Sequence, residues 1–189
     1  MNKLTIAALS LTLSWASFSA LAQSDADMKA MMAYATPGEI HKMMAKSVGN
    51  WSAAVTMWME PGAAPTNSTG EVKNEMILGG RYLQATNTGN FMGNPFEGIS
   101  ITGYDNAKKK FVNTWIDNMG TGIMFLTGTW DDATHSINFQ GTMCDPASGK
   151  DIPVREVVKF IDDNNQMMEM YAVMGAKEFK TMEIKFSRK

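Results

Sequence analysis

The pattern of apolar and polar positions changes once along the chain. Residues 24–35 are rich in Met and Ala and begin with acidic residues, which predicts a short helix. A second helix is predicted after it, because Ile40, Met43 and Val48 recur at helical spacing and Gly49 ends the pattern. From there onward the chain reads as short strands separated by Gly, Pro, Asn and Asp.

The start of the second helix carries its own sequence motif. Thr36 is expected to cap the helix, Pro37 to occupy its first position, and Glu39 to complete a capping box. A short helix with one apolar stripe has to dock against another element. We expect it to cover the mouth of a barrel or the edge of a sheet.

The remainder of the chain predicts a mainly β fold. Apolar and polar residues alternate in several segments, as in the last one, where Met182, Ile184 and Phe186 share a face. Ten strands with short turns and no helical crossover indicate an antiparallel up-and-down meander. Closing it into a barrel removes the exposed edges, and a two-sheet β-sandwich is the alternative. The expected strands are residues 51–59, 71–78, 81–88, 97–104, 111–118, 122–130, 135–142, 154–161, 167–174 and 179–187.

The N-terminus predicts export. Lys3 precedes an apolar stretch at residues 4–18, and Ala20-Leu21-Ala22 has the small-x-small pattern of a signal-peptidase site. The alternative, a membrane anchor, is disfavoured because the stretch is short and rich in Ala and Ser. The mature protein is thus expected in the periplasm or secreted, without integral membrane association. The expected division is a signal peptide at 1–22, an N-terminal helical segment at 23–36 and a single β-barrel domain at 37–189.

The net charge argues against nucleic-acid binding, and the cysteine content excludes an intramolecular disulfide. Loss of Lys3 with the signal peptide leaves 16 of the 17 basic residues against 19 acidic ones, a net charge of −3. This weak acidity offers no electrostatic basis for binding nucleic acid. Cys144 is the only cysteine, so an intramolecular disulfide is impossible, and we interpret it as a small buried or turn residue. The oligomeric state is not predicted.

Several residues are candidates for binding a ligand inside the barrel. Barrels of this size enclose side chains or one small ligand. Trp115 and Asp117 share a face with Phe111, and two charged residues interrupt otherwise apolar strands. A buried charge is unfavourable unless it is paired or used, and the alternative is that these residues face water or form a structural ion pair within the barrel. The candidate residues for binding a small apolar or amphipathic molecule are Trp58, Tyr104, Trp115, Asp117, Arg155 and Glu169.

The sequence contains no motif that fixes a reaction. A nucleophile elbow, a phosphate-binding Gly loop and a paired His–carboxylate signature are all missing, so no catalytic residue is assigned. An enzyme remains the alternative function, a hydrolase or isomerase that uses Asp117 or Glu169 with Arg155. It requires the three side chains to converge in one pocket.

Methionine and histidine raise the question of a metal or cofactor. The chain has 18 methionines, and thioethers bind Cu(I), but they follow core spacing without adjoining His. Lining of the core or of an adaptable apolar pocket explains them better. His41 and His135 are the only histidines, too few for a zinc site, although one His suffices for haem. We therefore predict no resident cofactor and no metal site, with copper or haem binding as the second alternative.

Short motifs follow one another from residue 37 to residue 189, beginning with Pro37-Gly38-Glu39-x-His41-Lys42 and continuing with Gly103-Tyr104-Asp105-Asn106. Their order resembles that of a bacterial family, domain-of-unknown-function family 1579 (DUF1579). The resemblance implies a barrel similar to lipocalin-like and nitrobindin-like proteins, which bind small apolar molecules or haem. It implies little about activity. The motifs that carry it also include Ile77-Leu78-Gly79-Gly80-Arg81-Tyr82-Leu83 and Trp115-Ile116-Asp117-Asn118-Met119-Gly120-Thr121.

Overall fold

The computed structural model describes residues 24–174 and 177–189. The predicted signal peptide at 1–22 lies outside these residues, and export stays a prediction. None of the helices within the described part is long and apolar enough to cross a membrane. The helices are α1 (Asp25–Ala35) and α2 (Glu39–Ala45). The strands are β1 (Gly49–Met57), β2 (Thr66–Ile77), β3 (Tyr82–Phe91), β4 (Asn94–Asp105), β5 (Lys110–Asp117), β6 (Met124–Asp131), β7 (Ser136–Asp145), β8 (Lys150–Asp162), β9 (Asn165–Met174) and β10 (Lys177–Arg188).

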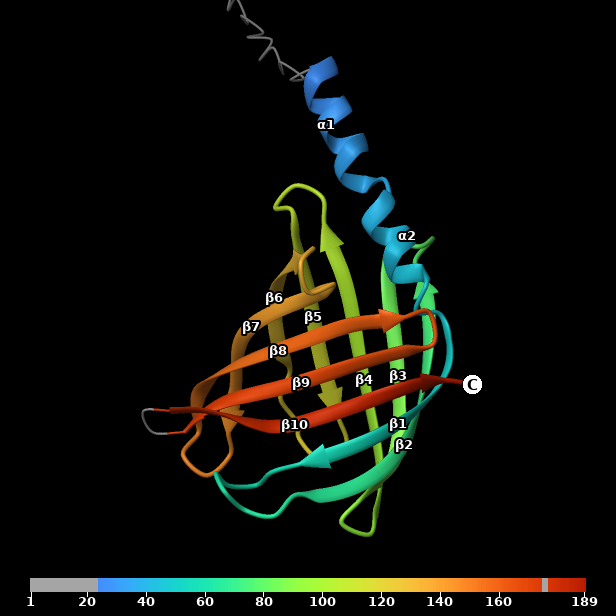
Figure 1. The fold of residues 1–189 in the computed structure, drawn as a ribbon. Coiled ribbons are helices and arrows are strands. Elements are labelled where there is room, and N and C mark those ends of the chain that lie inside the picture. The colour runs from blue at the N-terminus through green and yellow to red at the C-terminus, as the bar shows by residue number, and fades with distance from the viewer. Residues whose placement is uncertain (1–23, 175–176) are drawn as a thin grey trace, which may run out of the picture.

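The ten strands form one closed antiparallel barrel. Each strand pairs with the next along the chain, and β1 pairs with β10 to close the ring. The predicted up-and-down barrel is confirmed, and the sandwich alternative is wrong. In Figure 1, β8, β9 and β10 run across the barrel, whereas β3, β4 and β5 run along its length.

Turn chemistry sets the hairpins. The β2–β3 turn has positive φ at Gly79 and Gly80, 66° and 80°, where a side chain would be strained. Two expected loops are shorter than predicted. Strand β2 begins at Thr66 because its first residues already pair with β1, and the β3–β4 ladder continues to the Phe91–Asn94 pair.

The second helix begins later than predicted. Its N-cap is Gly38, whose N–H donates to His41 Nδ1 at 3.0 Å, so the imidazole takes the place of the predicted capping box. Thr36 instead belongs to the end of α1, where its Oγ1 donates to the Met32 carbonyl at 2.6 Å. The predicted seat is confirmed: α2 covers one end of the barrel (Figure 1) and inserts Met44, 2% exposed, into the core.

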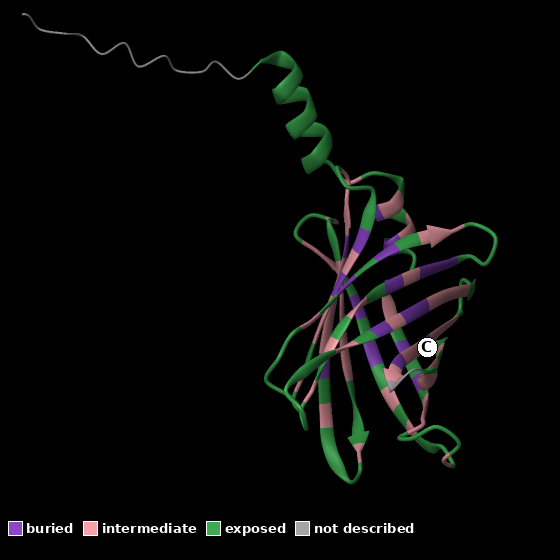
Figure 2. Ribbon diagram, turned by 90° about the vertical axis from the view of Figure 1, so that its left-hand side faces the viewer, coloured by how far each residue is buried: buried purple, intermediate pink, exposed green. Residues whose placement is uncertain are grey.

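The end of the barrel under α2 is closed by packing and hydrogen bonds. The Ser47 carbonyl accepts from Trp51 Nε1 at 2.9 Å and from Asn74 Nδ2 at 3.0 Å, and Gln166 Nε2 donates to the Ser47 hydroxyl. The Arg188 guanidinium lies 4.3 Å from the Trp51 ring centroid and donates to backbone carbonyls just before β1. We call this the closed end. Figure 2 shows that buried residues gather in this half of the barrel, whereas the far strand ends are mostly exposed.

The main core cluster lies on the β5–β9 side of the interior. Its buried aromatic residues, Phe111 and Phe139, are each 1% exposed and meet edge to face with centroids 6.4 Å apart. A residue of this size contributes about 1.5–3 kcal/mol when fully buried. The other buried members of the cluster are Met44, Leu126, Ile137, Val154 and Ala172.

Helix α1 has no buried residue and extends away from the barrel (Figure 1). Its C-terminal end is nevertheless fixed. Asn106 Nδ2 donates to three carbonyls, those of Ala33, Tyr34 and Thr36, and Arg81 donates to the Ala35 carbonyl at 2.7 Å.

Candidate ligand-binding site

Strand β5 presents its predicted candidates to the barrel interior. Its buried residues Phe111 and Asn113 fix which face points inward, and Trp115 and Asp117 continue that face toward the end opposite α2. We call this the open end. The predicted sharing of one face by these residues is confirmed.

Trp115 is held in a defined position at the open end. Its Nε1 donates to Asp117 Oδ2 at 2.6 Å, and its ring stacks on Phe96 with centroids 6.3 Å apart. Gly98 makes room for the ring, because a Cβ there would lie 2.5 Å from Trp115 Cζ2. Asp117 Oδ1 also accepts from the Met119 amide at 2.9 Å. The aspartate therefore orients Trp115 and ends β5, and both side chains remain partly accessible.

The opposite inner wall is built by methionines of β9 and β10. Met168 and Met170 alternate with outward residues on β9, and Met182 is the β10 partner of Met170. All three point inward yet are only partly buried. Because inward side chains of a sealed core would be buried, their partial exposure leaves part of this inner wall accessible to solvent. Methionine suits such a wall, since its flexible thioether adapts to different apolar shapes.

One inward-facing residue is not among the candidates predicted from the sequence. Glu156 on β8 pairs with Phe139 and Met170, both inward, and shares its face with buried Val154. It is 8% exposed, and burial raises the pKa of its carboxyl to about 7. The segment 154–160 does contain a signal for the inward face. The residues on the same face as Glu156 are all apolar, whereas the face of Arg155 also carries Lys159.

Arg155 lies on the outer face, in an ion pair. Its guanidinium donates to both carboxylate oxygens of Glu178, at 3.0 and 2.8 Å, and lies 3.9 Å from the Tyr171 ring centroid. The bond to Arg155 lowers the pKa of the Glu178 carboxyl. The ion pair is bidentate but partly exposed to solvent, so its contribution to the stability of the fold is modest.

Glu169 also points outward, into a network of lysines. It accepts from Lys159 at 2.8 Å and from Lys180 at 3.1 Å, and Lys180 bonds Glu183 as well. The hydrogen bond from Lys159 and then that from Lys180 lower the pKa of the Glu169 carboxyl. The alternative that these residues face away from the interior therefore describes both Arg155 and Glu169, and their ion pairs lie on the outer face and not within the barrel.

The arrangement that the enzyme alternative requires is not present. Asp117 lies on the inner face of β5, whereas Arg155 and Glu169 lie on the outer face of β8 and β9. Alternation separates the faces of a strand, so the barrel wall stands between the aspartate and the other two. The three side chains do not form one pocket.

The remaining two candidates lie at opposite ends. Tyr104 packs at the closed end, edge-on to Phe111 with centroids 5.0 Å apart and to His41 at 6.2 Å. Burial, and then nearby Arg81, lower the pKa of the His41 imidazole. Tyr104 is thus part of the support for α2.

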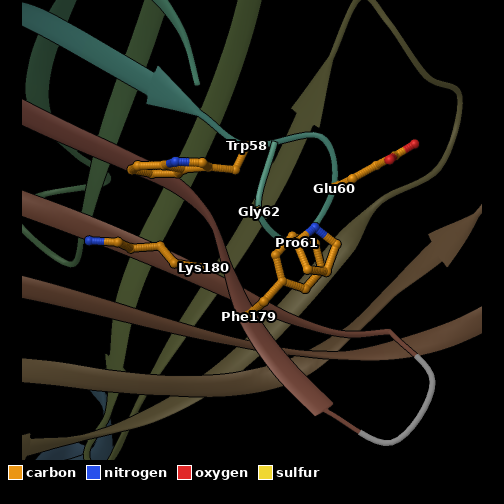
Figure 3. Close-up of a pocket in the computed structure, with 6 residues that line it drawn as sticks. All are labelled: Trp58, Glu60, Pro61, Gly62, Phe179 and Lys180. Carbon is orange, nitrogen blue, oxygen red and sulfur yellow. The ribbon is translucent and has the colours of Figure 1, made fainter. Parts of the chain in front are cut away.

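Trp58 lines a pocket on the rim of the open end. The pocket has a volume of about 250 Å³ and lies between the segment after β1 and the start of β10. Lys180 Nζ is 5.4 Å from the Trp58 ring centroid. In Figure 3 the Trp58 ring and the Lys180 chain extend in the same direction, Phe179 and Pro61 overlap in the view, and Glu60 points away.

Metal-ligating side chains do not gather in the described residues. No group of three or more His, Cys, Asp or Glu side chains forms there. His135 is exposed at the β6–β7 turn with φ of 48°. Cys144 is also exposed, at the end of β7 beside the 145–150 turn, so the turn interpretation of this residue holds and the buried one does not.

The fold and the accessible inner wall place the protein among small up-and-down β-barrels whose interior is plugged at one end. The family model described as "Protein of unknown function (DUF1579)" matches residues 36–188, and the chain belongs to this family. No curated protein sequence matches the chain.

Two solved structures match the chain. One is Rv2717c from M. tuberculosis, 12% identical with a TM-score of 0.61, a match covering 82% of this chain and 99% of that one. The other is a redesigned β-barrel, 13% identical with a TM-score of 0.40, covering 77% of this chain and 94% of that one. At such identities the first likeness concerns the fold alone.

Proposed function

We propose that this protein is exported and binds a small apolar or amphipathic molecule inside the barrel, through the open end. One observation carries the proposal: inward-facing side chains on opposite walls, Trp115 on one side and Met168, Met170 and Met182 on the other, remain partly accessible. Ligand sites are typically concave and mostly apolar, with a few polar groups that fix orientation. The interior supplies both kinds of surface.

A matched pair of substitutions tests where the ligand binds. Ser100 is the β4 partner of Trp115 on the inner face, whereas Ser52 is exposed on the outer face of β1. Ser100→Trp adds a large ring to the inner wall, and Ser52→Trp adds the same ring outside. We expect Ser100→Trp to weaken binding of the neutral fluorescent probe N-phenyl-naphthylamine by about tenfold or more, which corresponds to about 1.4 kcal/mol, and Ser52→Trp to leave it unchanged.

Circular dichroism would first establish that both variants keep the fold. Equal affinities of the two variants, or no binding of the probe to the parent protein, would contradict the proposal. Native mass spectrometry of protein purified from its own periplasm adds two readouts. It gives the mass of any retained ligand, and it shows whether the chain begins at Gln23, as cleavage after Ala22 predicts.

A further inference from the structure

The Glu156 side chain places a buried carboxyl on the inner wall of the barrel. Among the described residues, none donates a hydrogen bond to it and none forms a salt bridge with it; burial alone accounts for its raised pKa. Its oxygens are not among the fully enclosed, unpartnered side-chain atoms, of which the described residues contain one, Asn74 Oδ1. The carboxyl oxygens therefore keep some solvent-accessible surface.

The surroundings of Glu156 supply no charge that would compensate it. The inner face of β7 carries Ile137, Phe139 and Gly141, and that of β9 carries Gln166, Met168, Met170 and Ala172. The other titratable groups in inward register lie at strand ends or farther round the barrel: Asp145 and Lys150 at the open end of β7 and β8, Lys177 at the start of β10, Asp117 on β5, Tyr104 on β4, and Arg188 and His41 at the closed end.

A carboxyl in this position is unfavourable for the free protein. Burying an acidic group without a partner is destabilising, and natural proteins tolerate it chiefly where the group has a use. Glu169 is the contrasting case, because two lysines form ion pairs with its carboxylate on the outer face. No structural partner explains Glu156.

We infer that Glu156 is the recognition group for the head of the ligand, and that this ligand carries an ammonium group on an apolar body. The inference rests on the proposed function and names its ligand class. An ammonium donates charge-assisted hydrogen bonds to the carboxylate and neutralises it, which an alcohol or a second carboxylate does not. The apolar body would lie along Phe139 and Met170, the neighbours of Glu156 on β7 and β9.

Three probes of equal chain length test the inference: n-octylamine, n-octanol and octanoate, titrated by calorimetry at about pH 8. At that pH the carboxyl of the free protein is largely ionised. We expect octylamine to bind about tenfold to a hundredfold more tightly than octanol, and octanoate more weakly than either. Below about pH 6 the preference for the amine should shrink, because the carboxyl is protonated.

Two variants assign the effect to Glu156. Glu156→Gln keeps the size of the side chain and should remove the preference for octylamine while leaving octanol binding unchanged. Glu97→Gln, at an exposed carboxylate on the outer face of β4, is the matched control and should keep the preference. Thermal melts would establish that both variants fold.

The outcomes separate this inference from the proposed function. Octanol that binds as tightly as octylamine, or a Glu156→Gln variant that still prefers the amine, overturns the inference and leaves the proposed function standing. Failure of all three probes together with N-phenyl-naphthylamine overturns both.

Discussion

Arg155 and Glu156 are neighbours on β8 and have opposite surroundings. Arg155, on the outer face, is paired with Glu178 and stacked on Tyr171. Glu156, on the inner face, has no protein partner, and its carboxyl holds its proton to about pH 7. The comparison teaches that a charge within an apolar strand is informative only once its face is known. On the outside it is paired and structural, whereas on the inside it is unpaired and a candidate for function.

Substitutions on β7 should show the largest difference between the inner and the outer face in the free energy of unfolding. Phe139→Ala is expected to lower the free energy of unfolding by about 3–5 kcal/mol, because it empties a fully buried site. Gly128 lies against the ring, where a Cβ would be 2.7 Å from Phe139 Cδ1, and so cannot fill the space. Its outer neighbour Gln140→Ala should change stability by less than about 0.5 kcal/mol. Urea denaturation of both variants measures the difference, and similar midpoints would contradict the assignment of faces.

The next largest effect is the pH dependence that Glu156 imposes on stability. Its pKa rises from 4.5 in the unfolded chain to about 7 in the folded one. Between these values the folded state binds the proton that the unfolded state has lost, so stability falls as pH rises. The loss amounts to about 3 kcal/mol and is complete above about pH 7.

Glu156→Gln removes this dependence. The variant and the parent should have similar stability near pH 4, and the variant should become the more stable one by up to about 3 kcal/mol near pH 8. Urea denaturation at several pH values measures it. Parallel stability curves for the two proteins would mean that Glu156 is ionised at no cost, which requires a partner that the inner face does not supply.

The sequence sufficed for the architecture because alternation and turn residues are local signals. Ten strands, the two helices and the seat of α2 follow from them. The cap at Gly38 could not be predicted, since His41 rather than a hydroxyl satisfies it. The inward-facing residues could be predicted only in part: Trp115 and Asp117 do face inward, but the sequence pattern favours Arg155 over Glu156. Alternation defines two faces without saying which is inside, and only the packing of Phe139 and Ala172 against β8 decides it.

Glu169 is expected to have a smaller effect on stability, and its pH dependence should have the opposite sign to that of Glu156. Its lysine partners lower its folded pKa, so its stabilisation is present above 4.5, the unfolded value, and is lost as pH falls through the folded value. Glu169→Gln should therefore lower stability at neutral pH by about 1–2 kcal/mol and flatten the loss in acid. Glu97→Gln, at an exposed carboxylate outside the network, is the control and should stay within about 0.5 kcal/mol.

The sign of the Glu169 effect decides whether the two faces of β8 and β9 differ in kind. Protonation of a carboxylate that is paired with a cation destabilises the folded protein. Protonation of a buried carboxylate that lacks a partner stabilises it. If stability of the Glu169→Gln variant rose at neutral pH, as we expect for Glu156→Gln, then desolvation would outweigh the lysines on the outer face too. Burial rather than the missing partner would then explain both residues, and Glu156 would no longer differ from Glu169 in a way that indicates a binding group.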